Sequence, residues 1–268
     1  MSTELERLVA LVTCVNVYLQ DDETKINLEP TIAEYCHGFE FINNPYVRDD
    51  KTRVGKQIIA TDASKWFVHL KKQGPLRVRL HYRPSIRDDV PVGILTISAE
   101  CGSNWLVETQ YNKINRLYVN ILNPRVRGIS QPWKTFFALL EGACLNLEDT
   151  SPSVDESRKV LDLLLEELSD FVGRFEWSKH WVYTFNKSRK ILDEFEPSES
   201  DNLVPTGIYS KEARQLLQAA LGSWIFGGMS SWNDLAFRGK AAAQYSSLSK
   251  QLYETICKSI SSVVNSYP

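Results

Sequence analysis

Cysteine and histidine are scarce in this chain, and neither is spaced for metal binding. The 268 residues include 5 cysteines and 4 histidines. The cysteines are odd in number and scattered without a C-x-x-C pair, and no histidines follow the H-E-x-x-H spacing. A disulfide framework or a zinc site would need such patterns. We therefore expect reduced, mostly buried thiols, no metal site and no cofactor.

Sequence motifs of catalysis are also lacking. The chain has no G-x-G-x-x-G, no phosphate-binding loop with its lysine, and no G-x-S-x-G nucleophile elbow. Cys36 with His37, or Cys101 with His81, could form a nucleophile pair, but a free cysteine is more often a buried structural residue. These absences favour a binding protein over an enzyme. An enzyme whose site is assembled from distant residues remains a third alternative.

No long hydrophobic run is present. In the opening segment, MSTELERLVALVTCVNVYLQ, Glu4 and Glu6 precede a short apolar run, where a secretory signal would carry positive charge. A membrane-spanning helix needs about 20 consecutive apolar residues. The net charge of −2 gives no overall attraction to nucleic acid or to anionic membranes. These features predict a cytoplasmic protein that does not contact a membrane.

Local patterns predict an α+β fold whose first half contains a sheet. Residues 3–20 have helical periodicity, although their β-branched content leaves a strand as the alternative, and a polar, proline-marked stretch without a predicted element follows to about residue 60. A second helix is expected within residues 61–75, with Thr61 or Asp62 as N-cap and Gly74 as its end. Four runs have the character of strands, and short turns separate the last three: residues 76–83, 92–100, 105–111 and 116–122. Because short connections join neighbouring strands antiparallel, we predict a four-stranded antiparallel β-meander flanked by helices.

The second half of the chain is predicted to be mostly helical. Helices are expected within residues 130–147 and 153–175, the latter opened by a capping box of Ser153 and Glu156. The same apolar stripe continues to Phe195 after a break near Gly173, and residues 196–207 have the composition of a solvated linker. We predict one domain over residues 1–268, with the sheet in about 1–128 and the helical part in about 129–268.

The stretch GSWIFGGMSSWNDLAF, residues 222–237, lies between two predicted helices. Gly227 and Gly228 stand where the first of these helices is expected to end. A rigid corner, in which Ser231 and Asp234 cap a turn, explains most of the stretch. Trp232 either locks this corner onto the body of the protein or offers a binding surface. Trp232, Asn233 and Asp234 are therefore candidate partner-binding residues.

Charge is distributed unevenly along the chain. Residues 48–134 contain 16 Lys or Arg against 7 Asp or Glu, whereas residues 148–201 contain 7 against 14. The two stretches could neutralise each other or remain as solvated faces. Alternatively, the acidic helices, with Glu166 and Asp170, recognise a basic protein partner, as an inhibitor or immunity-type protein would. This protein-binding module is the function that we predict.

The basic strand supports a second alternative. In LRVRLHYR, residues 76–83, the basic residues alternate with apolar ones and share one face of the strand: Arg77, Arg79, His81 and Arg83. An exposed basic face can track the phosphates of a nucleic acid. Such a face normally carries aromatic stacking platforms as well, but Tyr82 alternates onto the apolar side. A nucleic-acid-binding protein is therefore the alternative prediction.

Overall fold

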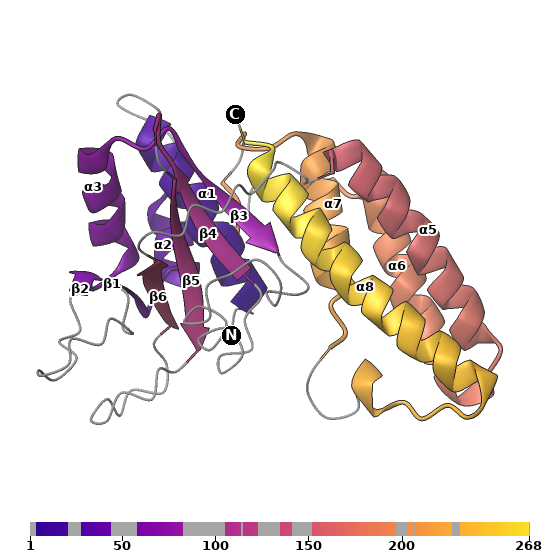
Figure 1. The fold of residues 1–268 in the computed structure, drawn as a ribbon. Coiled ribbons are helices and arrows are strands. Elements are labelled where there is room, and N and C mark those ends of the chain that lie inside the picture. Colours follow the sequence, from indigo (N-terminus) through magenta and orange to yellow (C-terminus); the bar gives the residue numbers. More distant parts are fainter. Residues whose placement is uncertain are drawn as a thin grey trace, which may run out of the picture. The chain divides into compact units, whose positions relative to one another are not determined.

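The computed structural model describes the following parts of the chain: residues 4–20, 28–43, 58–82, 105–113, 115–122, 135–140, 152–196, 203–205, 207–226 and 231–267. Contacts divide the chain into two compact units, drawn in Figure 1. The sheet unit comprises Met1–Asp149 and Asp201–Ile208, and the helical unit comprises Thr150–Ser200 and Tyr209–Pro268. The fold is therefore α+β, as predicted. That the chain acts as one domain stays a prediction.

The helices of the sheet unit follow local signals. Helix α1 spans Glu4–Gln20, α2 spans Glu29–Tyr35 and α3 spans Ala63–Gln73. Asp62 caps α3 by accepting a hydrogen bond from the Lys65 backbone N–H at 2.9 Å, and Gly74 ends it with a left-handed φ of 69°. The prediction of both α1 and α3 is confirmed. Helix α2 falls in a stretch whose pattern predicted no element.

The sheet is mixed rather than a four-stranded antiparallel meander. Its strands are β1 (Phe39–Asn43), β2 (Ile58–Ala60), β3 (Arg77–Tyr82), β4 (Trp105–Gln110), β5 (Arg116–Leu122) and β6 (Thr135–Leu140). The six strands lie in the order β2-β1-β6-β5-β4-β3. β1 pairs with β6 in parallel, and the other neighbours pair antiparallel. The predicted strand at residues 92–100 lies outside the described residues.

Strand β6 corrects the prediction of a helix within residues 130–147. Thr135–Leu140 pairs on one side with β1 and on the other with β5, so it is a central strand. Residues 135–139 are all buried, so both of its faces are covered. A strand buried on both faces is a continuous apolar run, and a short run of this kind cannot be distinguished from a buried helix by periodicity.

Aromatic rings form the core of the sheet unit. Phe41 of β1 stacks on Trp66 of α3 at 4.2 Å between ring centroids, and Trp66 meets Tyr118 of β5 edge-on at 5.4 Å. Val78 and Leu80, on the apolar side of β3, are also buried. Helix α3 contacts β1 and β2, and α1 contacts β3. The predicted apolar side of β3 is thus confirmed as a packed side.

Long helices dominate the helical unit (Figure 1). They are α5 (Val154–Gly173), α6 (His180–Glu194), α7 (Lys211–Gly222) and α8 (Lys240–Asn265), with the short 3₁₀ helices η1 (Glu176–Ser178) and η2 (Trp232–Asp234). The capping box of α5 is confirmed: Ser153 Oγ accepts from the Glu156 N–H, and the Ser153 N–H donates to the Glu156 carboxylate. The predicted break near Gly173 is the end of α5.

Two predicted boundaries in this half of the chain are wrong. Helix α7 ends at Gly222 and not at Gly227, which lies with Gly228 outside the described residues. Residues 196–207 are not wholly a solvated linker, because Leu203 and Val204 are buried and belong to the sheet unit. Both errors come from inferring a helix end and a solvated loop from local composition alone. Whether a short loop is buried depends on which residues pack against it.

Candidate functional sites

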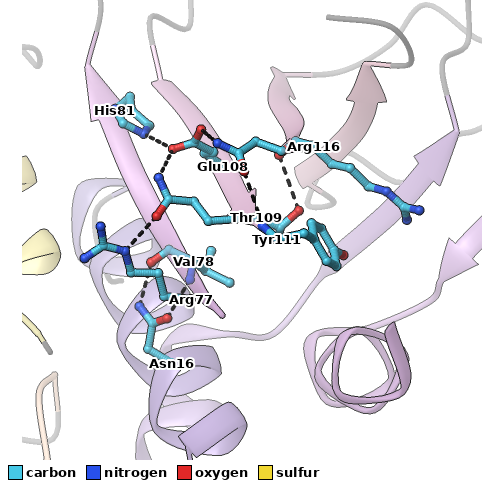
Figure 2. A network of polar contacts seen from close by, with 10 residues as sticks. Asn16, Arg77, Val78, His81, Glu108, Thr109, Tyr111 and Arg116 are labelled. Atoms are coloured by element: carbon cyan, nitrogen blue, oxygen red, sulfur yellow. Dashed lines mark hydrogen bonds and ion pairs between the residues drawn. The ribbon is translucent and has the colours of Figure 1, made fainter. Parts of the chain in front are cut away.

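A polar network joins β3 and β4, as Figure 2 shows. The strand register places Arg77 opposite Gln110, and Arg79 opposite Glu108. His81 Nε2 lies 2.9 Å from a carboxylate oxygen of Glu108, which is 1% exposed. The imidazole and the carboxylate therefore form a buried pair across the two strands.

Further donors stabilise the negative charge of Glu108. Gln110 Nε2 donates to the same carboxylate oxygen as His81 at 3.0 Å, and Asn115 Nδ2 donates to the other at 2.8 Å. Burial alone would raise the pKa of Glu108, but the hydrogen bond and the charge of His81, with the hydrogen bonds from Gln110 and Asn115, outweigh it and lower that pKa. Glu108 is thus held as a carboxylate.

Three basic residues of β3 are buried or half-buried, and two of them, Arg77 and His81, belong to this network. Arg79 is 5% exposed and His81 8% exposed, and half-buried Arg77 donates from Nε to Gln110 at 2.7 Å. Arg83 lies outside the described residues. Phosphate contacts require exposed cationic groups, so this strand gives the nucleic-acid alternative no support. The sequence indicated a basic side of β3 but not the acidic and amide residues of β4 opposite it.

Helix α1 closes the outer edge of β3. Asn16 Nδ2 donates to the Val78 carbonyl, and the Val78 N–H donates to Asn16 Oδ1, both at 2.7 Å (Figure 2). Among the described strands, β3 is the last of the sheet, so no described strand adjoins its outer backbone groups. The amide of Asn16 satisfies this edge at Val78, which explains an asparagine among the buried residues of α1.

Trp232 is fully buried within the helical unit. Its ring packs edge-on against Trp181 and Phe185, with centroids 5.7 and 5.5 Å away. Its Nε1 donates to Ser249 Oγ of α8 at 2.7 Å. Trp232 thus locks the corner onto the helices and presents no surface of its own. The next two residues, Asn233 and Asp234, are exposed, and Asp234 accepts a hydrogen bond from the Ser231 N–H.

The predicted acidic residues Glu166 and Asp170 lie on the surface of α5 in different environments. Glu166 is 3.4 Å from a guanidinium nitrogen of Arg189 on α6, which also pairs with Asp162 at 2.8 Å. Asp170 is exposed and forms no ion pair within the described part of the chain. Part of the acidic charge therefore joins α5 to α6, and part remains available to a partner.

One exposed stripe of α5 combines carboxylates with apolar side chains. Its members recur at alternating intervals of four and three residues, so they share one side of the helix: Glu156, Val160, Leu163, Glu167 and Asp170. We call this stripe the acidic face. Val160 is 54% exposed and Leu163 65% exposed, whereas most large apolar residues of a helix that packs on a core are expected to be buried. The sequence did not reveal that these two residues are exposed, because they stand among leucines whose helical spacing marks the buried side of α5.

The thiols within the described chain are structural. Cys14, Cys36 and Cys257 are buried. The hydrogen bond to Cys36 and burial raise the pKa of Cys14 far above its usual range, and burial raises that of Cys257. Since the thiolate is the nucleophile, these shifts disfavour a nucleophilic role for Cys14 and Cys257. Cys101 lies outside the described residues, and no group of three or more metal-ligating side chains occurs among those described.

Comparison with known proteins gives no relative. A scan against protein-family models found no match, and neither did searches of the curated proteins and of the solved structures. Over the segments that could be searched, none of the helices combines the length and hydropathy needed to cross a membrane. The function of the chain is therefore inferred from the geometry of its surfaces.

Proposed function

We propose that this protein is a protein-binding module whose acidic face on α5 docks a basic amphipathic helix of a partner. The supporting observation is the exposure of Val160 and Leu163, one helical turn apart, beside Glu167 and Asp170. A helix that lies along α5 would cover the apolar pair with its own apolar anchors at i and i+3 or i+4. Its lysines or arginines would meet the two carboxylates.

Charge complementarity supports a basic partner rather than a neutral one. Neither Glu167 nor Asp170 forms an ion pair with any described residue. Complementary charge steers a partner into contact and suppresses wrong ones, while the apolar pair supplies the contact that is removed from water. An inhibitor or immunity-type protein that neutralises a cationic nuclease or toxin would use a surface of this kind.

The test is a selection of 16-residue random peptides, displayed on phage, against the full chain and two variants. The first variant, Leu163→Ser with Glu167→Lys, alters the acidic face. The control, Tyr183→Ser with Glu194→Lys, makes the same kinds of change at exposed positions of α6. Because all four side chains are exposed, both variants should remain folded, which circular dichroism would verify.

Basic amphipathic peptides should be enriched on the unaltered chain and on the control, and lost on the first variant. For the best peptide, the dissociation constant from fluorescence anisotropy should rise more than tenfold in the first variant, as for a central interface residue. It should also rise with salt. The proposal would be contradicted if the selection did not enrich basic peptides. It would also be contradicted if basic peptides bound the first variant as tightly as the unaltered chain.

A further inference from the structure

Aromatic rings cluster at one end of the helical unit, where α5 ends and α6 and α8 begin. Phe237 lies 4.8 Å from Trp177 and 5.0 Å from Phe175, between ring centroids. The cluster continues inward through Phe171 and Tyr245, which lie at 4.9 Å from Phe237. Its outermost ring is Trp177, which is 50% exposed. A half-exposed tryptophan that rests on a packed cluster is a preformed anchor for a partner.

The turn that carries Trp177 is fixed to the end of α5. Ser178 is buried, and its hydroxyl donates to the Val172 carbonyl at 2.8 Å. Its N–H donates to the Phe175 carbonyl at 3.0 Å. The backbone on the C-terminal side of Trp177 is thus anchored, so presenting the indole to a partner costs little conformational entropy.

Exposed cations adjoin these rings in the chain. Arg174 caps the C-terminus of α5 next to Phe175, and Arg238 and Lys240 follow Phe237. None of the three forms an ion pair with a described residue. The N-termini of α6 and α8 have no acidic residue in the first turn and no side-chain cap, so the positive ends of both helix dipoles add to this charge.

We propose that this aromatic end is a second docking surface, which binds an acidic segment of a partner protein. The aromatic end is defined by Arg174, Phe175, Trp177, Phe237, Arg238 and Lys240. An apolar side chain of the segment packs on Trp177, and its carboxylates pair with the cations around it. The surface differs from the acidic face in position and in charge, so it extends the proposed function and does not depend on it.

The observations favour a short acidic peptide over a nucleic acid. A single-stranded nucleic acid needs a basic path and several stacking rings, whereas here only Trp177 is exposed and Phe175 and Phe237 are half-buried. Asp170 and Asp234, both exposed, belong to the same two segments of the chain as these rings and would repel a polyanion that extended beyond the patch. A patch whose three cations form no ion pair with the described residues suits a short anionic segment.

The experiment uses the same random peptide library with two variants of the aromatic end and one control. Trp177→Ala removes the anchor, and Arg238→Glu with Lys240→Glu reverses the charge. Tyr183→Ala removes an aromatic side chain that is 72% exposed on α6 and serves as the control. The charge-reversal variant alters two exposed positions and should remain folded. It therefore still tests the proposed surface if Trp177→Ala disturbs the fold.

Peptides rich in Asp and Glu around an apolar anchor should be enriched on the unaltered chain and on Tyr183→Ala. Their dissociation constants should rise at least tenfold in Trp177→Ala and in the charge-reversal variant. No acidic enrichment, or acidic peptides that bind both variants unchanged, would overturn the inference. The inference would also be overturned if a 20-nucleotide oligothymidylate or phosphatidylserine vesicles bound in a Trp177-dependent way while acidic peptides did not bind. Basic peptides report on the acidic face, so the two proposals fail separately.

Discussion

Replacing Trp232 with alanine should be among the most destabilising substitutions in the helical unit. The side chain is fully buried, packs on Trp181, Phe185 and Tyr245, and donates a hydrogen bond to Ser249. Truncation of a buried tryptophan to alanine costs about 3–5 kcal/mol, because apolar contacts are lost and a cavity remains. Ser249 still donates to the Tyr245 carbonyl, so its hydroxyl is not stranded. We therefore expect a loss of about 4 kcal/mol, within that range.

The assay is urea unfolding followed by circular dichroism at 222 nm, which reports on the long helices of the helical unit. Trp232→Phe should cost about 1–2 kcal/mol, since it keeps most of the packing and loses the hydrogen bond of about 1 kcal/mol. The exposed neighbour Asn233 is the control, and Asn233→Ala should change stability by less than about 0.5 kcal/mol. A loss below about 1 kcal/mol for Trp232→Ala would refute the reasoning that this corner is held by its tryptophan.

Two further predictions concern the sheet unit. Glu108→Gln should cost about 2 kcal/mol at pH 7, because hydrogen bonds to a buried charge are lost. Since the pKa of Glu108 is lowered in the folded state, its contribution is present above the unfolded-state pKa of about 4.3 and is lost as the pH falls through the lower pKa of the folded state. The unfolding free energy of the unaltered chain should thus fall more steeply with acid than that of the variant; parallel profiles would argue against the lowered pKa. Asn16→Leu strands the N–H and carbonyl of Val78, and we expect a loss of about 3 kcal/mol in urea unfolding. A loss under about 1 kcal/mol would show that another group satisfies that edge.

Features that depend on a few neighbouring residues were predictable from the sequence. The ends of α3 follow from Asp62 and Gly74, and the start of α5 follows from Ser153 and Glu156. Each of these signals acts within a few residues, because a cap satisfies backbone groups of the adjacent turn. The two sides of β3 were also predictable, since alternation fixes them without knowledge of the partner strand.

Features that depend on distant pairing were not predictable. β6 pairs in parallel with β1, which lies far earlier in the chain, and no local pattern encodes that partner. The pair of His81 and Glu108 depends on the register between β3 and β4. One signal was available: Glu108 and Gln110 alternate along a strand that was predicted to belong to the same meander as the basic one. That pattern suggests a paired polar side rather than a phosphate-binding face.

The proposed binding surfaces were not predictable from the sequence either. Val160 and Leu163 resemble core residues in the sequence, and their exposure follows only from which side of α5 faces α6 and α8. Trp177 lies in a turn whose direction is set by the buried hydroxyl of Ser178. A side chain can recognise a partner only if it stays exposed after the helices have packed. Sequence periodicity alone does not determine which side chains stay exposed.

The parallel pairing of β1 with β6 sets the order in which the sheet can form during synthesis. Phe39 pairs with Thr135, so β1 gains its inner neighbour only after the ribosome has released residues 135–140. Until then, the inner edge of β1 has no partner strand in the nascent chain. Closing so long a loop slows folding and leaves this edge open to chaperones or to aggregation. Translation pauses beyond residue 140 would therefore favour correct assembly, and truncation before it would yield an open sheet.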